Sequence, residues 1–164
     1  MDSNSFITPS NQYYQFSIAR SFWDKIEKHI VDGDIAILDA VFEEIKKGED
    51  DLSEWIKGIT ITNYISRKNP IIIQNYSNIL KYIQESGYYK SIALKEWSRY
   101  ECADPWLIAT AKAHNLTIVT FESKKGLLQK RQPSAQPKIP NVAAEFGVRC
   151  CSLFDMMKEL GITI

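Results

Sequence analysis

One stretch, from Asp104 to Glu122, constrains the fold more than any other part of the chain; it reads DPWLIATAKAHNLTIVTFE. Its pattern predicts a helix that opens on Asp-Pro, a turn at 114–115 and an apolar strand over 116–120. This unit puts one carboxylate at a helix start and another just past the carboxyl end of a strand. In α/β folds, ligand-binding side chains gather at both places.

The alternation of helices and strands continues along the rest of the chain. After Glu122 comes a stretch rich in Pro, Gln and Ser, 123–141, which we expect to be a mobile loop. Ser152 and Asp155 have the spacing of a capping box. The pattern favours a three-layer α/β/α domain with a mainly parallel central sheet, formed by residues 1–164 as a single domain. Helices are expected over 21–32, from the cap Asp39 to the stop at Gly48, and over 51–57, 71–86, 90–98, 141–146 and 153–160, and strands over 35–38 and 148–151.

Charge and cysteine content exclude several classes of protein. The 20 basic and 20 acidic residues cancel, so no field of the whole chain attracts nucleic acid or membrane, and nucleic-acid affinity has to come from a local patch. Cys102, Cys150 and Cys151 lack the C-x-x-C spacing of a zinc site, and their odd number argues against a disulfide framework. We expect them to be small buried side chains. With no leader and no membrane-length apolar run, the expected location is the cytoplasm.

Four acids occupy positions that a parallel sheet would bring to one edge. Asp2 lies at the start of the chain, Glu44 in the helix after the first strand, Asp104 at its helix start, and Glu122 after the strand 116–120. Clustered carboxylates repel one another unless a cation joins them. Mg²⁺ or Mn²⁺ prefers such oxygen ligands and can hold a phosphodiester for in-line cleavage. The four acids together therefore predict a metal-dependent nuclease.

Each acid taken alone also has a simpler interpretation. Asp104 before Pro105 is a good helix N-cap, and Glu44 belongs to a run of acids that mostly face water. Glu122 can simply begin a loop, and Asp2 can belong to a frayed terminus. The four acids as a set, rather than any one of them, favour the metal site.

The ordered motifs resemble those of PIN-domain ribonucleases, the fold of VapC-type bacterial toxins, and most closely an uncharacterised PIN-like subfamily of prokaryotic proteins. The resemblance implies a Mg²⁺- or Mn²⁺-dependent endoribonuclease that cuts single-stranded RNA as the toxin of a toxin–antitoxin pair. It also implies an antitoxin protein that covers the acidic cleft, and a homodimer. The motifs are DSNSFI at 2–7, SFWDKIE at 21–27, VFEEIKKG at 41–48, DDLSEW at 50–55, ADPWLIATAKAHNLTIVTFE at 103–122, KIPNVAAEFGVRC at 138–150 and LFDMMKELGI at 153–162.

The resemblance assigns a role to particular residues. Asp2, Glu44, Asp104 and Glu122 would be both the metal ligands and the catalytic acids, with Glu43 as the competing choice for Glu44. Asn4 would orient the first aspartate, and Thr120 would supply a supporting hydroxyl.

Two features depart from the PIN pattern. Many PIN domains have aspartate where this chain has Glu122, and the longer side chain would reach the ion through water. Only Met1 precedes Asp2, so the usual first strand is expected to be truncated, Asp2 to lose its anchor, and an upstream apolar extension to stabilise the protein. Both departures favour the alternative, a catalytically silent PIN-like module that binds RNA or protein. A nuclease that acts on DNA is a third possibility.

Basic residues follow Glu122 without an acid among them. Beside a cation site they would bind the phosphates that flank a cut, although basic loops are more often only solvated. Trp106 and Phe121 are candidates to stack an unpaired base, with a core position as the alternative for Trp106. The basic residues are Lys124, Lys125, Lys130, Arg131 and Lys138.

Overall fold

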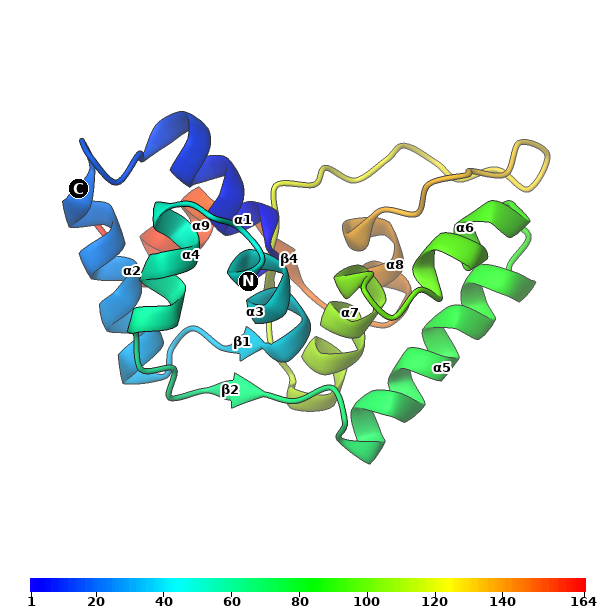
Figure 1. Cartoon of the computed structure of the whole chain (residues 1–164). Coiled ribbons are helices and arrows are strands. Elements are labelled where there is room, and N and C mark those ends of the chain that lie inside the picture. The colour runs from blue at the N-terminus through cyan, green and yellow to red at the C-terminus, as the bar shows by residue number, and fades with distance from the viewer. The chain divides into compact units, whose positions relative to one another are not determined.

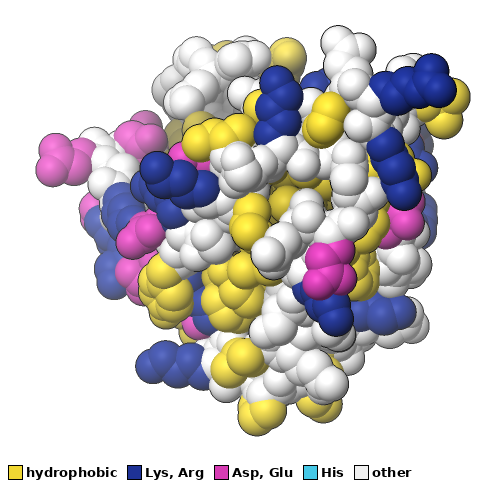
Figure 2. All heavy atoms as spheres, turned by 90° about the vertical axis from the view of Figure 1, so that its right-hand side faces the viewer, with side chains coloured by type: hydrophobic (Ala, Val, Ile, Leu, Met, Phe, Trp, Pro, Cys, Tyr) yellow, Lys and Arg dark blue, Asp and Glu magenta, His cyan; other side chains and the backbone are white.

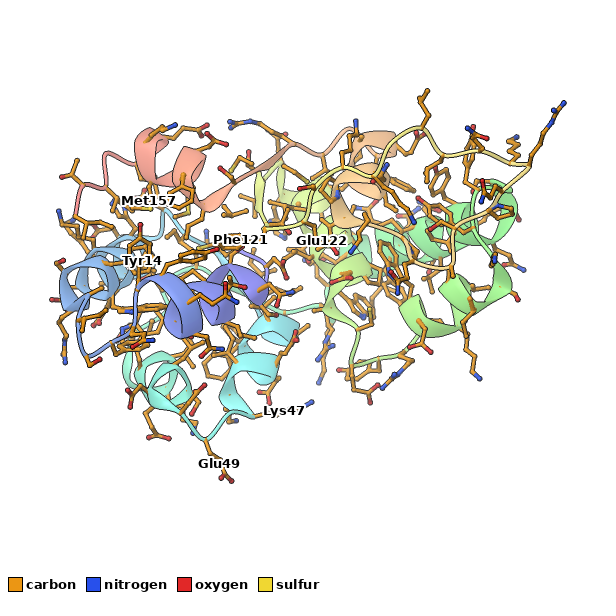
Figure 3. All side chains as sticks on the ribbon, turned by 90° about the horizontal axis from the view of Figure 1, so that it is seen from above. Tyr14, Lys47, Glu49, Phe121, Glu122 and Met157 are labelled. Atoms are coloured by element: carbon orange, nitrogen blue, oxygen red, sulfur yellow. The ribbon has the colours of Figure 1, made fainter.

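The computed structural model describes residues 1–164 and divides them into two compact units. Unit 1 consists of Met1–Ser66, Val119–Phe121 and Cys151–Ile164. Unit 2 consists of Arg67–Ile118 and Glu122–Cys150. The chain therefore passes between the units several times, and Phe121 and Glu122, labelled in Figure 3, are neighbours in sequence that belong to different units.

Unit 1 is built mainly from short helices, with one small sheet (Figure 1). In that sheet the two strands run parallel, with Ile37 opposite Tyr64 and Leu38 opposite Ile65. The elements of unit 1 are α1 (Asn4–Thr8), the π-helix η1 (Pro9–Tyr13), α2 (Arg20–Asp32), β1 (Ile37–Leu38), α3 (Asp39–Lys46), α4 (Asp51–Gly58), β2 (Tyr64–Ile65) and α9 (Leu153–Glu159).

The core of unit 1 centres on aromatic side chains. Trp23, on the apolar face of α2, is buried; its ring stacks on Phe16 at 4.3 Å and meets Trp55 edge-on at 5.0 Å. The Trp23 indole N–H donates a hydrogen bond of 2.6 Å to the Tyr14 carbonyl, so the one polar atom of this ring is satisfied. Gly33, with φ of 88°, ends α2 in the left-handed conformation that glycine adopts without strain.

Unit 2 is built around a buried helix. The helix α7 (Ala103–His114) is buried at nearly every position from Ala103 to Ala111 and packs against α5 (Pro70–Glu85). Asn115, at φ of 52°, terminates α7. The other helices are α6 (Ser91–Trp97) and α8 (Ile139–Glu145).

A second sheet forms where the chain passes between the units. Its strands are β3 (Ile118–Val119) and β4 (Cys150–Cys151). Within unit 2 the Ile118 N–H donates to the Arg149 carbonyl at 2.9 Å, and within unit 1 the Thr120 N–H donates to the Cys151 carbonyl at 3.1 Å. This spacing is that of a parallel ladder.

The fold confirms a mixed helix–strand protein with parallel strand pairs, and it confirms all the expected helices. The expected strands are present but only two residues long, and they form two separate two-stranded sheets. The segment of α1 and η1 and the strand β2 were not predicted. The capping box of Ser152 and Asp155 is confirmed, since each side chain bonds the other residue's backbone N–H. The expectation of buried cysteines is wrong, because all three are half-buried; none is in a disulfide.

The segment 123–138, called the basic loop below, has more fixed contacts than its composition predicts. The Lys125 N–H donates to the Asn141 side chain at 2.8 Å, and the Asn141 amide donates back to the Lys125 carbonyl at 3.0 Å. Ser134 pairs with the α5–α6 connection through backbone bonds to Tyr88 and Lys90 at 2.8 and 2.9 Å. The loop is therefore attached to its own unit at several points, which argues against the predicted mobility.

Candidate functional site

In unit 1, Asp2 is held firmly. Its side chain is buried, its N–H donates to the Val119 carbonyl at 2.9 Å, and its carboxylate accepts from the Thr120 hydroxyl at 3.0 Å. Ser5 adds a hydrogen bond of 3.0 Å from its hydroxyl to the same Val119 carbonyl. The expectation of an unanchored Asp2 was wrong, because the end of β3 and the residue after it bond both the N–H and the carboxylate of Asp2.

Glu44 is the acid that the structure connects to this end of the chain. The Ser3 hydroxyl donates a hydrogen bond of 2.6 Å to the Glu44 carboxylate, and Ser3 is itself buried next to Asp2. Glu43 instead lies 3.7 Å from the Lys46 ammonium on the exposed side of α3. Of the two competing glutamates, Glu44 is therefore the one coupled to the Asp2 segment. Ser3 was not predicted as a site residue, because it belongs to no recognisable motif of its own.

The other supporting residue of unit 1, Asn4, is exposed and opens α1. The acids near α3 and α4 largely face water as expected; Glu49, for example, lies in the connection between α3 and α4 and projects away from the ribbon in Figure 3. These surface acids have no part in the site.

In unit 2, Asp104 is not the N-cap that the Asp-Pro motif suggested. The helix α7 begins at Ala103, Cys102 occupies the N-cap position, and no side chain caps this helix end. Asp104 lies in the first turn, where a carboxylate is stabilised by the helix dipole. The capping interpretation was wrong because the helix starts at Ala103, two residues before the proline that was expected to open it.

Glu122 joins the two ends of the basic loop. One carboxylate oxygen, Oε1, accepts from the Lys138 ammonium at 2.8 Å, and the other, Oε2, accepts from the Ile139 N–H at 2.7 Å. Ile139 is the first residue of α8, so Glu122 also satisfies a backbone donor at that helix start. Both oxygens of Glu122 thus have partners within unit 2.

Asp104 and Glu122 line one cavity of unit 2, which we call the acid-lined pocket; its volume is about 470 Å³. Four carboxylates and two cationic side chains line it, so its walls carry a net negative charge. The lining residues are Glu96, Trp97, Arg99, Glu101, Cys102, Asp104, Glu122, Ala135, Gln136, Pro137 and Lys138.

The neutral chain consists of two oppositely charged units. Unit 2 contains 13 basic and 6 acidic residues, a net charge of +7, whereas unit 1 contains 7 basic and 14 acidic residues, a net charge of −7. In Figure 2 the Lys and Arg side chains are spread over the face shown rather than gathered in one patch. A net-neutral sequence therefore conceals a unit whose charge suits a polyanion, and the acid-lined pocket is an acidic exception within it.

Carboxylate oxygens are the ligand type that a hard divalent cation prefers, but these carboxylates do not form a full set of ligands on their own. In neither unit do three or more His, Cys, Asp or Glu side chains gather into a group that could hold a metal ion. Mg²⁺, however, is usually bound by one or two carboxylates, with waters and substrate phosphates as its remaining ligands. In unit 2, Asp104 and Glu122 provide two carboxylates that line one cavity. In unit 1, the Ser3 hydroxyl links Glu44 to the segment of Asp2.

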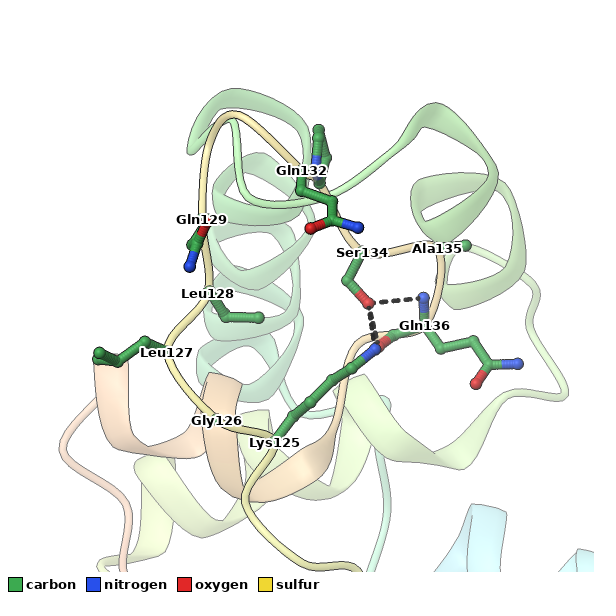
Figure 4. Close-up of a pocket in the computed structure, with 10 residues that line it drawn as sticks. Lys125, Gly126, Leu127, Leu128, Gln129, Gln132, Ser134, Ala135 and Gln136 are labelled. Carbon is green, nitrogen blue, oxygen red and sulfur yellow. Dashed lines mark hydrogen bonds between the residues drawn. The ribbon is translucent and has the colours of Figure 1, made fainter.

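The basic loop presents its cations in different ways. The Lys125 ammonium donates to the Ser134 hydroxyl at 3.1 Å, beside a cavity of about 500 Å³ that residues 125–136 enclose (Figure 4). The Lys130 ammonium lies 5.5 Å from the centre of the Tyr88 ring. Lys124 and Arg131 are exposed. Four cations of this loop are thus accessible at the surface of the basic unit.

The aromatic residues proposed to stack a base already have partners. Trp106 is buried and stacks on Tyr76 with ring centres 3.7 Å apart, so it belongs to the core. Phe121 stacks on Tyr13 at 6.4 Å. Tyr100, which the sequence analysis missed, is 56% exposed in the turn between α6 and α7, with the Arg67 guanidinium 4.0 Å from its ring centre.

Together these features describe a mixed α/β protein with an acid-lined pocket in a positively charged unit. The chain belongs to the family described as Domain of unknown function (DUF4411), whose model matches residues 1–164. Neither the curated proteins nor the solved structures contain a match to the chain. None of its helices combines the length and apolar character that crossing a membrane requires.

Proposed function

We propose that this protein is a PIN-like, Mg²⁺- or Mn²⁺-dependent endoribonuclease that cleaves single-stranded RNA. The observation that carries the proposal is the shared pocket of Asp104 and Glu122 inside a unit of net charge +7. An acidic pocket suits a divalent cation, and its basic surroundings suit the phosphates of a nucleic acid. A three-layer PIN fold is part of the proposal.

The residues divide into those that would hold the cation and those that would hold RNA. Asp104 and Glu122 would be ligands in unit 2, and the resemblance assigns the same role to Asp2 and Glu44 in unit 1. A bound cation would supply a Lewis acid for the phosphodiester. The Thr120 hydroxyl fixes the Asp2 carboxylate at 3.0 Å. Partners of this kind orient metal ligands and contribute to affinity.

The RNA-binding part of the proposal rests on the basic loop. Lys124, Lys125, Lys130 and Arg131 lie in the same unit as the acid-lined pocket and follow Glu122 directly in sequence. Neutralising phosphates with such side chains favours binding without base specificity. The biological setting that we propose is the toxin of a toxin–antitoxin pair, active as a homodimer and inhibited by an antitoxin that covers the acidic site.

One observation favours the second candidate, a catalytically silent module that binds RNA or protein. Both oxygens of Glu122 have partners, the Lys138 ammonium and the Ile139 N–H. On this view Glu122 is a structural clasp for the basic loop, and the acid-lined pocket holds no cation.

Cleavage of a mixed single-stranded RNA with Mn²⁺ or Mg²⁺ tests the proposal, with a single-stranded DNA of the same sequence alongside. The protein is compared with Asp104→Asn and with Glu101→Gln, a matched control on the same pocket wall. Metal-dependent cutting that Asp104→Asn abolishes and Glu101→Gln retains would support the nuclease. Folded proteins that cut neither nucleic acid would favour the silent module.

Thermal unfolding separates the two candidates independently of the substrate. A cation that binds only the folded protein at about 100 times its Kd stabilises it by about 2.7 kcal/mol. The nuclease predicts that Mn²⁺ raises the Tm of the wild-type protein and of Glu101→Gln but not of Asp104→Asn. The silent module predicts the same Tm with and without Mn²⁺ in all three.

A further inference from the structure

We propose that Lys138 is an internal competitor of the divalent cation: its ammonium neutralises Glu122 in the metal-free protein and has to leave before a metal ion can bind that carboxylate. The inference rests on the proposed metal site, and it gives the ion pair of Lys138 and Glu122 a role in cation binding. Lys138 would thus set the cation affinity of the pocket rather than only bind RNA.

The Lys138 ammonium and the Ile139 N–H both donate to Glu122, but they differ in how easily they can leave. Oε2 accepts from a backbone donor, the Ile139 N–H at 2.7 Å, which is fixed at the start of α8. Oε1 accepts from the ammonium of Lys138 at 2.8 Å, at the end of a flexible side chain that is 37% exposed. When Lys138 leaves, the backbone bond still holds Glu122 in place. Glu122 would then offer one oriented oxygen, which is what a ligand through a single oxygen requires.

The charge balance of the acid-lined pocket also gives Lys138 this role. Its carboxylates face two cationic side chains, Arg99 and Lys138. Arg99 lies 3.3 Å from the Glu96 carboxylate, its neighbour on the preceding turn. Lys138 instead pairs with Glu122. Without it, the carboxylates would repel one another more strongly and would bind a dication more tightly.

Once released, the Lys138 ammonium would be free to contact an RNA phosphate. Lys138 closes the basic loop, whose other cations are the proposed phosphate contacts. After its release from Glu122, the Lys138 ammonium would donate a hydrogen bond to an RNA phosphate. RNA and the metal ion would therefore each favour the binding of the other. Because coupling between two ligands is reciprocal, RNA should raise the affinity for Mn²⁺ by the same factor as Mn²⁺ raises the affinity for RNA.

Direct Mn²⁺ binding, followed by the electron paramagnetic resonance signal of the free ion, tests the proposal without any cleavage assay. Lys138→Met is compared with the wild-type protein, with Lys138→Arg and with Lys125→Met, whose ammonium contacts Ser134 instead. We expect Lys138→Met to bind Mn²⁺ about two- to fivefold more tightly, as the loss of one partly exposed ion pair implies. Lys138→Arg and Lys125→Met should bind like the wild type, and Asp104→Asn should bind weakly.

A second measurement uses the wild-type protein and so does not depend on the folding of a variant. Release from Glu122 should make the Lys138 amine more reactive toward an acylating reagent when Mn²⁺ is added, as measured by mass spectrometry. In Asp104→Asn this increase should disappear. Lys125 provides the internal control, with equal reactivity in both conditions.

The outcomes separate this inference from the proposed function. If Lys138→Met binds Mn²⁺ no more tightly than the wild type while Asp104→Asn still binds weakly, the role of Lys138 is wrong and the metal site stands. If Mn²⁺ binds none of the proteins and leaves Lys138 reactivity unchanged, both proposals fail. If only Lys138→Met binds Mn²⁺, the result would directly support competition between Lys138 and the cation for Glu122.

Discussion

The Thr120 hydroxyl donates a hydrogen bond of 3.0 Å to the carboxylate of Asp2, a residue 118 positions earlier in the chain. Both side chains are buried, and the Asp2 N–H is bonded to Val119, the last residue of β3. The end of one strand therefore fixes the position and orientation of an acid that a sequence pattern places at a loose terminus. A carboxylate held in this way is ready to act as a ligand, because its orientation costs nothing further on binding.

Replacing Thr120 by valine should destabilise the protein. The substitution keeps the shape of the side chain but removes a donor to a buried carboxylate, a bond worth about 1.5–3 kcal/mol. Urea unfolding measures the loss. Thr117→Val, at an exposed position just before β3, is the control and should change stability by no more than about 0.5 kcal/mol. Equal stability of the two variants would show that the Thr120–Asp2 bond contributes little.

Glu44→Gln and Glu43→Gln should differ in cleavage activity. Glu44 is bonded to Ser3 beside Asp2, whereas Glu43 lies near Lys46 at the surface. We expect Glu44→Gln to lower kcat/KM by about 100-fold and Glu43→Gln to leave it nearly unchanged, since loss of groups in or next to a metal site costs about 10- to 100-fold. Rate measurements at saturating Mn²⁺ check this. The reverse order would move the ligand to Glu43.

Stability should fall at high pH because of two tyrosines of unit 2. Burial raises the pKa of Tyr82 to about 12 and raises that of Tyr89 still further, with the Glu145 carboxylate adding to both shifts. In the unfolded chain both titrate near their ordinary pKa of 10. The folded state therefore holds these protons more tightly. Its stabilisation relative to the unfolded chain is complete below pH 10 and is lost as the pH rises through about 12.

Urea midpoints between pH 9 and 12 measure this decline. Tyr82→Phe should make the decline shallower, because one of the two groups no longer titrates. Tyr13→Phe, at a tyrosine that is 54% exposed, is the control and should follow the wild-type curve. A wild-type protein whose stability stays constant up to pH 12 would contradict the burial argument.

Charge reversal in the basic loop should weaken RNA binding and flatten its dependence on salt. Removing one cation that neutralises a phosphate lowers the slope of log K against log salt by about 0.7 for single strands. Lys130→Glu with Arg131→Glu should therefore reduce the slope by more than one. Lys158→Glu, a charge reversal at a side chain of unit 1 that is 79% exposed, is the matched control. Equal slopes for both variants would exclude the basic loop from the interface.

Local signals in the sequence predicted the helices well, and one particular cap. Ser152 and Asp155 lie within one turn, so their side chains find each other's backbone whatever the rest of the chain does. Apolar side chains at helical spacing on α2 and α5 predicted those helices for the same reason. The α1–η1 segment escaped prediction because it is polar and contains Pro9, a residue that usually marks a break.

The acids themselves were visible in the sequence, but their partners were not. Ser3 reaches Glu44 across 41 residues, and Thr120 reaches Asp2 across 118. Glu122 bonds Lys138 and Ile139 only because the two ends of the basic loop lie close together. Such contacts depend on how the elements pack, and no local spacing encodes them.

By itself, the sequence determined the mixture of helices and strands, the order of the helices and the residue types available for a cation site, because these depend on periodicity, caps and composition. Only the tertiary structure decided which hydroxyls hold which carboxylates and that Asp104 shares a pocket with Lys138. It also divided a chain of net charge zero into units of −7 and +7. The physical reason is that electrostatics and hydrogen bonding act through distances in space, which the chain sets only after its apolar faces have packed.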